Sequence, residues 1–314
     1  MRWCWALMLC ACGTLESQSG APANAPASGL GPIAPITDDT GLSWVPPFIL
    51  SAPARDLGHP SVIVDGDSID LWVSSSANDV SSIGHAHASS FEAGMGDLDE
   101  ALRATRSWEH GSVSSPSVIS TDLGPLMMYV ASGRVGLARY DGDAWTAGAV
   151  PIYADATGAI SAVAAARVDD RARLLVLIDG RIDALECSLA SLASGAPSFS
   201  VTRAVLTTPS WGTRLLDVGL RIDRTATGRW REDAFFGAAL PNVMDFGAQP
   251  TPSAVGAASH FLDEGAMFSL VTLPVSSGPP FPTSATTVVY RGGVLFFYSA
   301  RSGPRNAIGI GRWP

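Results

Sequence analysis

The residues of this chain that could perform chemistry are few and scattered. His85 and His87 stand two positions apart, so on a β-strand both imidazoles would face the same side, as two zinc ligands can. No convincing third ligand lies near them in sequence, although His110 or Asp79 could fold close to the pair. A polar outer strand or loop accounts for both histidines more simply. We therefore expect no metal site and no cofactor.

The remaining chemical signals are also weak. Cys187 lies in an alternating apolar stretch, which indicates a buried, inert thiol. The sequence holds no nucleophile elbow, phosphate-binding loop or zincin helix. Two groups of acids fall in loop-like segments and are expected to be solvated rather than to bind calcium: Asp97, Asp99 and Glu100, and Asp263 and Glu264.

The bulk composition limits the class of protein and of partner. The 314 residues are 46% hydrophobic and 16% charged, which suits a folded globular chain. The net charge of −9 argues against nucleic acid or an anionic membrane surface as a partner, because both require clustered cations. Every basic residue is Arg, which we attribute to codon bias and not to function.

The first residues carry an export signal. Met1 and Arg2 give a positive start, and the apolar run at 3–12 is too short to span a bilayer. The sequence Leu-Cys-Ala-Cys at 9–12, followed by Gly13, resembles the lipobox of bacterial lipoproteins. The resemblance implies that residues 1–11 are removed and that Cys12 is lipidated. An ordinary secretory signal is the alternative.

The segment after this signal has the composition of a linker. Residues 12–41 are rich in Gly, Pro, Ala and Ser without a hydrophobic period, which predicts a flexible tether. We expect an exported cell-envelope lipoprotein, on the periplasmic face or the cell surface, with its membrane contact through Cys12. Cys187 would then lack any partner for an intramolecular disulfide. Oligomeric state cannot be read from these features.

From residue 42 to 314, short β-branched and aromatic runs alternate with Gly, Pro, Ser and Asp turns, as in an all-β domain. A three-strand unit recurs here. Its clearest copies are residues 59–64, 69–74 and 83–86; 115–119, 126–132 and 135–138; and 286–290, 294–300 and 308–310. Weaker copies cover 162–178 and 216–258. Residues 98–106 have a helical composition and are expected to form an insertion or loop.

A fourth strand that opens on an aromatic residue accompanies each unit. Its copies are residues 44–50, 108–113, 145–152, 199–206 and 268–275. Four strands repeated five times predict a five-bladed β-propeller, with a β-sandwich as the alternative. The last unit has no strand after it, and the segment 44–50 precedes the first. We expect this segment to complete the last blade and close the ring.

The sequence of the repeat units resembles that of the five-bladed glycoside hydrolases of the arabinanase, xylosidase and β-fructosidase type. In that family a blade reads Asp-Pro-Ser-Val, an Asp-Gly turn, an aromatic strand and Ile-Gly-x-Ala. The resemblance covers most of residues 42–314, but it consists of short structural motifs that any propeller blade requires. It implies a site in the central funnel, where acids at the starts of the inner strands perform glycoside hydrolysis.

Those acid positions are largely empty in this sequence. The expected Asp is replaced by His59 in the first unit, Ser115 in the second, Ala162 or Val163 in the third and Ala285 in the fifth, while Asp217 remains in the fourth. One carboxylate cannot both attack and donate a proton. Glu186 matches a short acid motif of the β-fructosidases, but it falls in a third strand, away from the axis.

These positions favour a non-catalytic binding or scaffold propeller over an enzyme. His59, Ser115 and Asp217 would line its ligand funnel, and a glycan is the natural ligand. The alternative is a divergent glycoside hydrolase with Asp217 as base and Glu232, Asp233 or Glu186 as acid. Two carboxyl groups separated by roughly 5 to 10 Å across the funnel would distinguish the second case.

Overall fold

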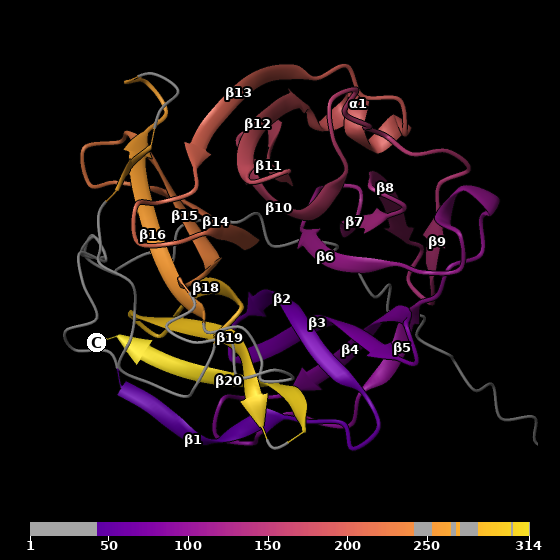
Figure 1. Ribbon diagram of the computed structural model, residues 1–314, viewed down its shortest axis with the longest axis vertical. Coiled ribbons are helices and arrows are strands. Elements are labelled where there is room, and N and C mark those ends of the chain that lie inside the picture. The colour runs from indigo at the N-terminus through magenta and orange to yellow at the C-terminus, as the bar shows by residue number, and fades with distance from the viewer. Residues whose placement is uncertain (1–42, 242–252, 265–267, 271–281, 303, 314) are drawn as a thin grey trace, which may run out of the picture.

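The computed structural model describes residues 43–241, 253–264, 268–270, 282–302 and 304–313. The expected signal, Cys12 and tether lie outside these residues. Five four-stranded antiparallel sheets stand around a common axis and form a five-bladed β-propeller, as predicted (Figure 1). Within the described residues, no helix has the length and apolar character needed to cross a membrane.

Each blade runs outward from an inner strand that faces the axis. Blade 1 contains β2 (Asp56–Asp65), β3 (Ser68–Ala77), β4 (Val80–Ala88) and β5 (Asp99–Leu102); blade 2 contains β6 (Ser114–Ile119), β7 (Leu126–Ala131), β8 (Arg134–Tyr140) and β9 (Trp145–Ala147). Blade 3 contains β10 (Ile160–Val168), β11 (Arg171–Ile178), β12 (Arg181–Ser188) and β13 (Ser200–Thr207); blade 4 contains β14 (Arg214–Arg224), β15 (Trp230–Ala239), β16 (Ser253–Phe261) and β17 (Ser269–Leu270). Blade 5 contains β18 (Ser284–Tyr290), β19 (Gly293–Ser302), β20 (Arg305–Trp313) and, from the other end of the chain, β1 (Ser43–Leu50).

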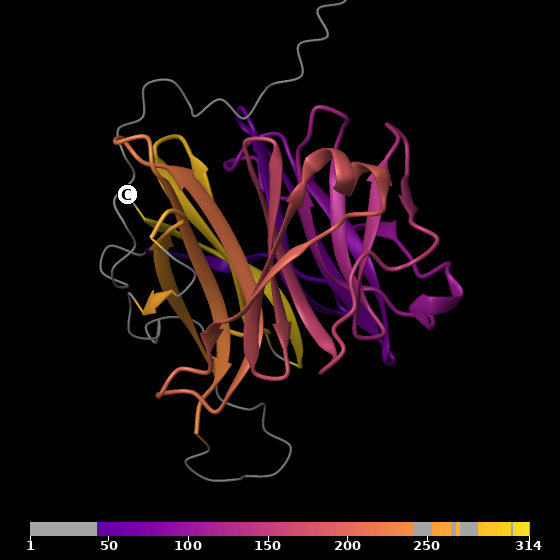
Figure 2. The same cartoon turned by 90° about the horizontal axis from the view of Figure 1, so that it is seen from above.

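The apolar core lies between the blades. Five clusters of buried side chains each join two neighbouring sheets, and together they occupy every interface around the ring. Figure 2 shows the sheets packed face to face around the axis. Because both faces of a sheet are covered, central strands are largely buried: all six residues of β7 are apolar and buried.

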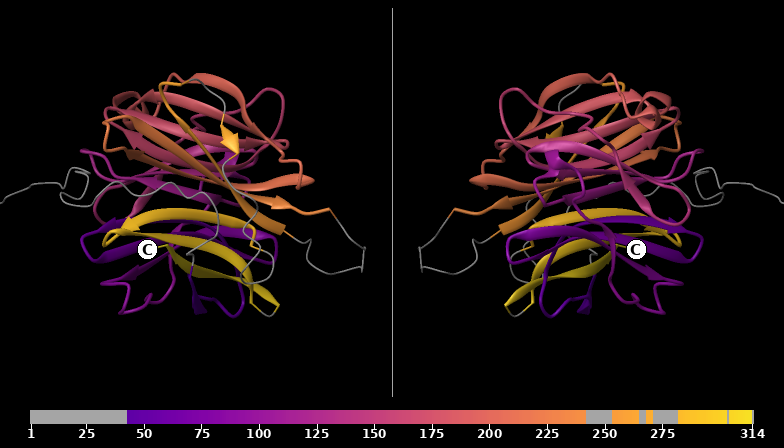
Figure 3. Two further views of the ribbon diagram at one scale, coloured as in Figure 1. Left: turned by 90° about the vertical axis from the view of Figure 1, so that its left-hand side faces the viewer. Right: turned by 90° about the vertical axis from the view of Figure 1, so that its right-hand side faces the viewer.

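The N-terminal strand closes the ring as expected. β1 pairs antiparallel with β20, and Figure 3 shows the indigo strand beside the yellow one. Leu50 at its end is buried with Ile308 and Ile310 in the cluster between blades 5 and 1. The outer strand of blade 5 therefore comes from the opposite end of the chain.

Blade 1 differs from the sequence expectation. Its fourth strand is β5, within the segment 98–106 for which a helical composition suggested a loop. Pairing with β4 and burial of Leu102 outweigh the local helical preference. Residues 108–113 are not a strand: a 3₁₀ turn, η1 (Ser107–Glu109), places Trp108 against Tyr129 of blade 2, with ring centroids 6.0 Å apart.

Candidate functional site

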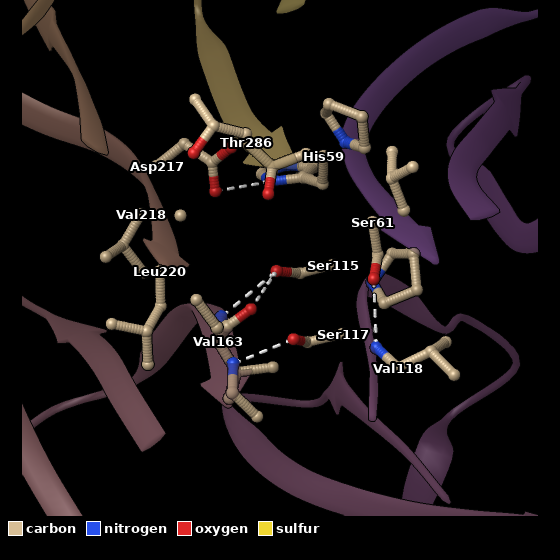
Figure 4. Close-up of a pocket in the computed structure, with 17 residues that line it drawn as sticks. His59, Ser61, Ser115, Ser117, Val118, Val163, Asp217, Val218, Leu220 and Thr286 are labelled. Carbon is tan, nitrogen blue, oxygen red and sulfur yellow. Dashed lines mark hydrogen bonds and ion pairs between the residues drawn. The ribbon is translucent and has the colours of Figure 1, made fainter. Parts of the chain in front are cut away.

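A histidine and a carboxylate from distant parts of the chain meet at the axis. His59 of β2 and Asp217 of β14 are 158 positions apart, and His59 Nδ1 lies 2.7 Å from Asp217 Oδ1 (Figure 4). The backbone N–H of His59 also donates to Ser284 Oγ of β18, at 3.1 Å. The imidazole is therefore held between blades 1, 4 and 5.

Irregular pairing near the starts of inner strands sets where these side chains point. A register shift interrupts the pairing with the second strand of the blade at Gly58/Ser61 in β2, Ser114/Ser117 in β6 and Leu215/Asp217 in β14. His59 and Ser115 both have positive φ, 48° and 50°. Bulges of this kind redirect a side chain, which explains why the three predicted funnel residues line the same central cavity.

The charge state of His59 depends on Asp217. Burial in the funnel disfavours the imidazolium, but the Asp217 carboxylate and its hydrogen bond outweigh burial and raise the pKa of His59 above its ordinary 6.5. The His59 side chain is 29% exposed and that of Asp217 only 4%. A ligand arriving from solvent would therefore meet His59 first, with Asp217 behind it.

Below this pair, serines connect the blades. Ser61 Oγ accepts from the Val118 amide at 2.9 Å, and Ser115 Oγ accepts from the Val163 amide at 3.0 Å. Ser117 Oγ accepts from the Ala165 amide of β10 in the same way, at 2.8 Å. Ser115, expected to be a ligand group, is 1% exposed and holds blade 3 to blade 2 through this bond.

Two cavities share His59 as a lining residue. The inner one, about 60 Å³, follows the axis past Asp217 and the serines (Figure 4). The outer one, about 300 Å³, lies where the inner strands of blades 1, 2 and 5 begin, and includes Asp56, Ser114 and Ser284. His59 therefore stands at the boundary between a narrow channel and a wider chamber.

The sequence interpretation missed Asp56, which shares the outer cavity with His59. Burial raises its pKa, but hydrogen bonds from the Asn306 amide and Arg305 outweigh this and lower the pKa below 3.8, so the group is ionised at neutral pH. Its place at the first residue of β2, three before His59, was the available signal. Among the described lining residues of both cavities, the carboxylates are Asp56 and Asp217.

The other proposed acids lie elsewhere. Glu232 is fully buried and bonds to Arg173 and His260. Asp233 bonds to Arg221, Arg231 and Ser259. Glu186 pairs with Arg171 on the exposed part of blade 3. The described lining of either cavity includes none of the three acids.

The paired histidines of blade 1 also have a partner within the fold. His85 Nε2 and His87 Nδ1 lie 2.8 and 3.0 Å from the same oxygen of Asp70, and the His85 ring stacks on Trp72 with centroids 4.9 Å apart. Within the part of the chain that the structure describes, no group of three or more His, Cys, Asp or Glu residues is arranged to hold a metal ion. Cys187 is buried, and burial raises the pKa of its thiol.

No protein-family model matches the chain, and no curated protein matches its sequence. Solved structures do match. The catalytic domain of a GH62 α-L-arabinofuranosidase from Coprinopsis cinerea is 10% identical, with a TM-score of 0.62 over 86% of this chain and 96% of that one. PaAbf62A, an α-L-arabinofuranosidase from Podospora anserina solved with cellotriose, is 10% identical, with a TM-score of 0.61 over 87% of this chain and 96% of that one. A GH43_1 enzyme from Xanthomonas citri is 14% identical, with a TM-score of 0.60 over 84% of this chain and 90% of that one.

These similarities concern the fold, and they correct the expected function. A non-catalytic binding or scaffold propeller was expected, but the solved structures that share this architecture over most of their length are glycoside hydrolases, which favours the alternative, a divergent hydrolase. The expectation was wrong because it counted acids only at aligned inner-strand positions. Asp56 enters the funnel from just outside that register.

Proposed function

We propose that the protein is a divergent glycoside hydrolase whose reaction centre is His59, supported by Asp217. The observation that carries the proposal is the 2.7 Å contact between His59 Nδ1 and Asp217 Oδ1 at the axis of a five-bladed propeller. In glycoside hydrolysis one group protonates the leaving oxygen and a second acts on the other side of the sugar. His59 and Asp56 are the ionisable pair that the outer cavity offers for these roles.

In this proposal the imidazolium of His59 donates its proton to the glycosidic oxygen as the bond from that oxygen to the anomeric carbon breaks. Water adds to the anomeric carbon and gives its proton to the Asp56 carboxylate. That proton then returns through solvent to the neutral imidazole, so the net reaction consumes one water. Asp217 does not meet the sugar; it orients His59 and keeps it protonated, as the aspartate of a catalytic triad orients its histidine.

The variant His59→Asn tests the donor role. Asn accepts the positive φ of position 59 better than most residues, and loss of a general acid lowers a rate by about 10²–10⁴-fold. We expect that loss on substrates with a sugar leaving group. A much smaller loss is expected on nitrophenyl glycosides, whose leaving group needs little protonation.

The matched control is His87→Asn, which changes an exposed histidine outside both cavities and leaves rates unchanged. Rates are measured on a panel of aryl glycosides and oligosaccharides. An equal loss on both substrate types would remove His59 as proton donor. Absence of hydrolysis by the wild-type domain across the panel would overturn the hydrolase proposal.

The location of the protein belongs to the same proposal. The lipobox-like sequence ending at Cys12 supports export and lipid anchoring at the cell envelope, which would place the domain where extracellular glycans are met. Mass spectrometry of the N-terminus after expression in a bacterium tests this. A mature chain that begins elsewhere than at a lipidated Cys12 would exclude it.

A further inference from the structure

The outer cavity has the size of one small ligand. Its volume of about 300 Å³ is at the lower limit of pockets that enclose an organic molecule. The inner cavity beyond it, about 60 Å³, has room for a few water molecules and not for a sugar ring. A chain entering the funnel therefore stops at His59, where the two cavities meet.

More than half of the described residues that line the outer cavity carry a hydroxyl group. Seven of its described lining residues carry one: Ser74, Ser76, Ser81, Ser114, Thr283, Ser284 and Ser299. A hydroxyl can both donate and accept, so the partly exposed ones, Ser76, Ser81, Ser114 and Thr283, keep capacity for a ligand. The described lining contains no Trp, Tyr or Phe, so polar contacts and not aromatic stacking would orient a sugar here.

The charges around the cavity are balanced. Arg305 Nη1 donates to Asp56 Oδ2 at 2.8 Å, and His59 is matched by Asp217. An anionic sugar would meet the Asp56 carboxylate without gaining a free cation from the described lining. A neutral sugar has no such cost, because its hydroxyls can bond to the serines.

From the size, the narrow floor and the hydroxyl walls, we infer that the outer cavity holds a single neutral pentosyl or hexosyl unit at the end of a glycan chain or branch. The inference rests on the proposed hydrolase function, and it makes the enzyme exo-acting: each cleavage releases a monosaccharide. Internal cleavage would require the chain to continue past His59, where the channel is too narrow.

A binding experiment tests the cavity without depending on catalysis. Neutral pentoses and hexoses, and the corresponding uronic acids, are titrated into the domain and followed by saturation-transfer NMR. Ser114→Phe fills the cavity; Ser200→Phe, on the exposed outer strand of blade 3, is the matched control. We expect at least one neutral sugar to bind, a loss of tenfold or more in Ser114→Phe, and wild-type affinity in Ser200→Phe.

Circular dichroism tests whether Ser114→Phe is folded. If it is not, Ser76→Phe, which changes another lining residue of the same cavity, replaces it. Uronic acids that bind as tightly as the neutral sugars, or neutral sugars that bind equally to wild type and the filled variant, would overturn the inference. Failure of every neutral sugar to bind would overturn it as well.

A cleavage experiment separates this inference from the hydrolase proposal. Neutral oligosaccharides are digested and the early products are resolved by chromatography. Monosaccharides alone support an exo-acting cavity. Oligosaccharide products overturn it while the hydrolase proposal stands. Cavity-dependent binding without any cleavage overturns the hydrolase proposal and supports the single-unit binding cavity.

Discussion

His59 combines two properties that a proton donor needs. It is accessible from the outer cavity, and a carboxylate behind it favours its charged form. The catalytic value of a histidine depends on how close its pKa lies to the working pH. A raised pKa keeps the imidazolium populated at neutral pH, where an isolated buried histidine would be uncharged.

The pH dependence of activity follows from that shift. Activity that requires protonated His59 persists above pH 6.5 and is lost as the pH rises through the raised pKa. Asp217→Asn removes the charge and leaves burial, which lowers the pKa, so the alkaline limb of kcat/KM should move to lower pH. NMR titration of the His59 ring provides an independent reading of the same shift.

The free energy of unfolding depends on pH in the same direction as the activity does. Because the folded pKa of His59 is raised, its contribution to stability is complete below pH 6.5 and declines as the pH rises through the folded value. The control for the activity profile is Asp122→Asn, which breaks an exposed pair with Arg167 and should leave the alkaline limb of kcat/KM in place. An unchanged limb in Asp217→Asn would contradict the role given to Asp217.

Among the strands, charged groups join neighbouring blades. Arg173 of β11 donates from Nε and Nη2 to the two oxygens of Glu232 in β15, at 3.1 and 3.0 Å, across the interface of blades 3 and 4. His260 of β16 contacts the same carboxylate. These groups are buried, so the energy of the interface depends on their remaining paired.

Glu232→Gln should therefore destabilise the fold without affecting the reaction. Removing one member of a buried ion pair leaves its partner uncompensated, which costs about 3–5 kcal/mol. Glu186→Gln breaks the more exposed pair with Arg171 and should cost about 1 kcal/mol or less. Urea unfolding measures both. A loss of activity in folded Glu232→Gln beyond that of Glu186→Gln would return Glu232 to the list of catalytic acids.

For the whole molecule, closure of the ring depends on one strand from the far end of the chain. β1 covers the outer edge of β20, and without it blade 5 would expose unpaired backbone groups. The apolar cluster between blades 5 and 1 would also lose Leu50.

Two truncations that differ by little more than this strand test the closure. A chain that begins at residue 42 should fold like the full protein, because it retains β1. A chain that begins at residue 51 should unfold at a lower urea concentration and associate through its exposed edge. Size-exclusion chromatography and urea unfolding compare them. Equal stability of the two chains would show that β1 does not hold the ring closed.

The sequence by itself determined the five-fold repeat, the closing strand and the apolar interiors of the strands. Hairpins pair residues close in sequence, so their register and turns leave a readable pattern. The strand β5 was not predicted because its four residues have a helical composition. Only the tertiary structure decided which ionisable groups meet. His59 reaches Asp217 across 158 residues, Asp56 shares the chamber, and Arg173 and Arg221 hold Glu232 and Asp233 away from it. The contacts of His59 with Asp217 and of Arg173 with Glu232 form between blades, where the curvature of the closed ring sets the distances, and no local spacing encodes them.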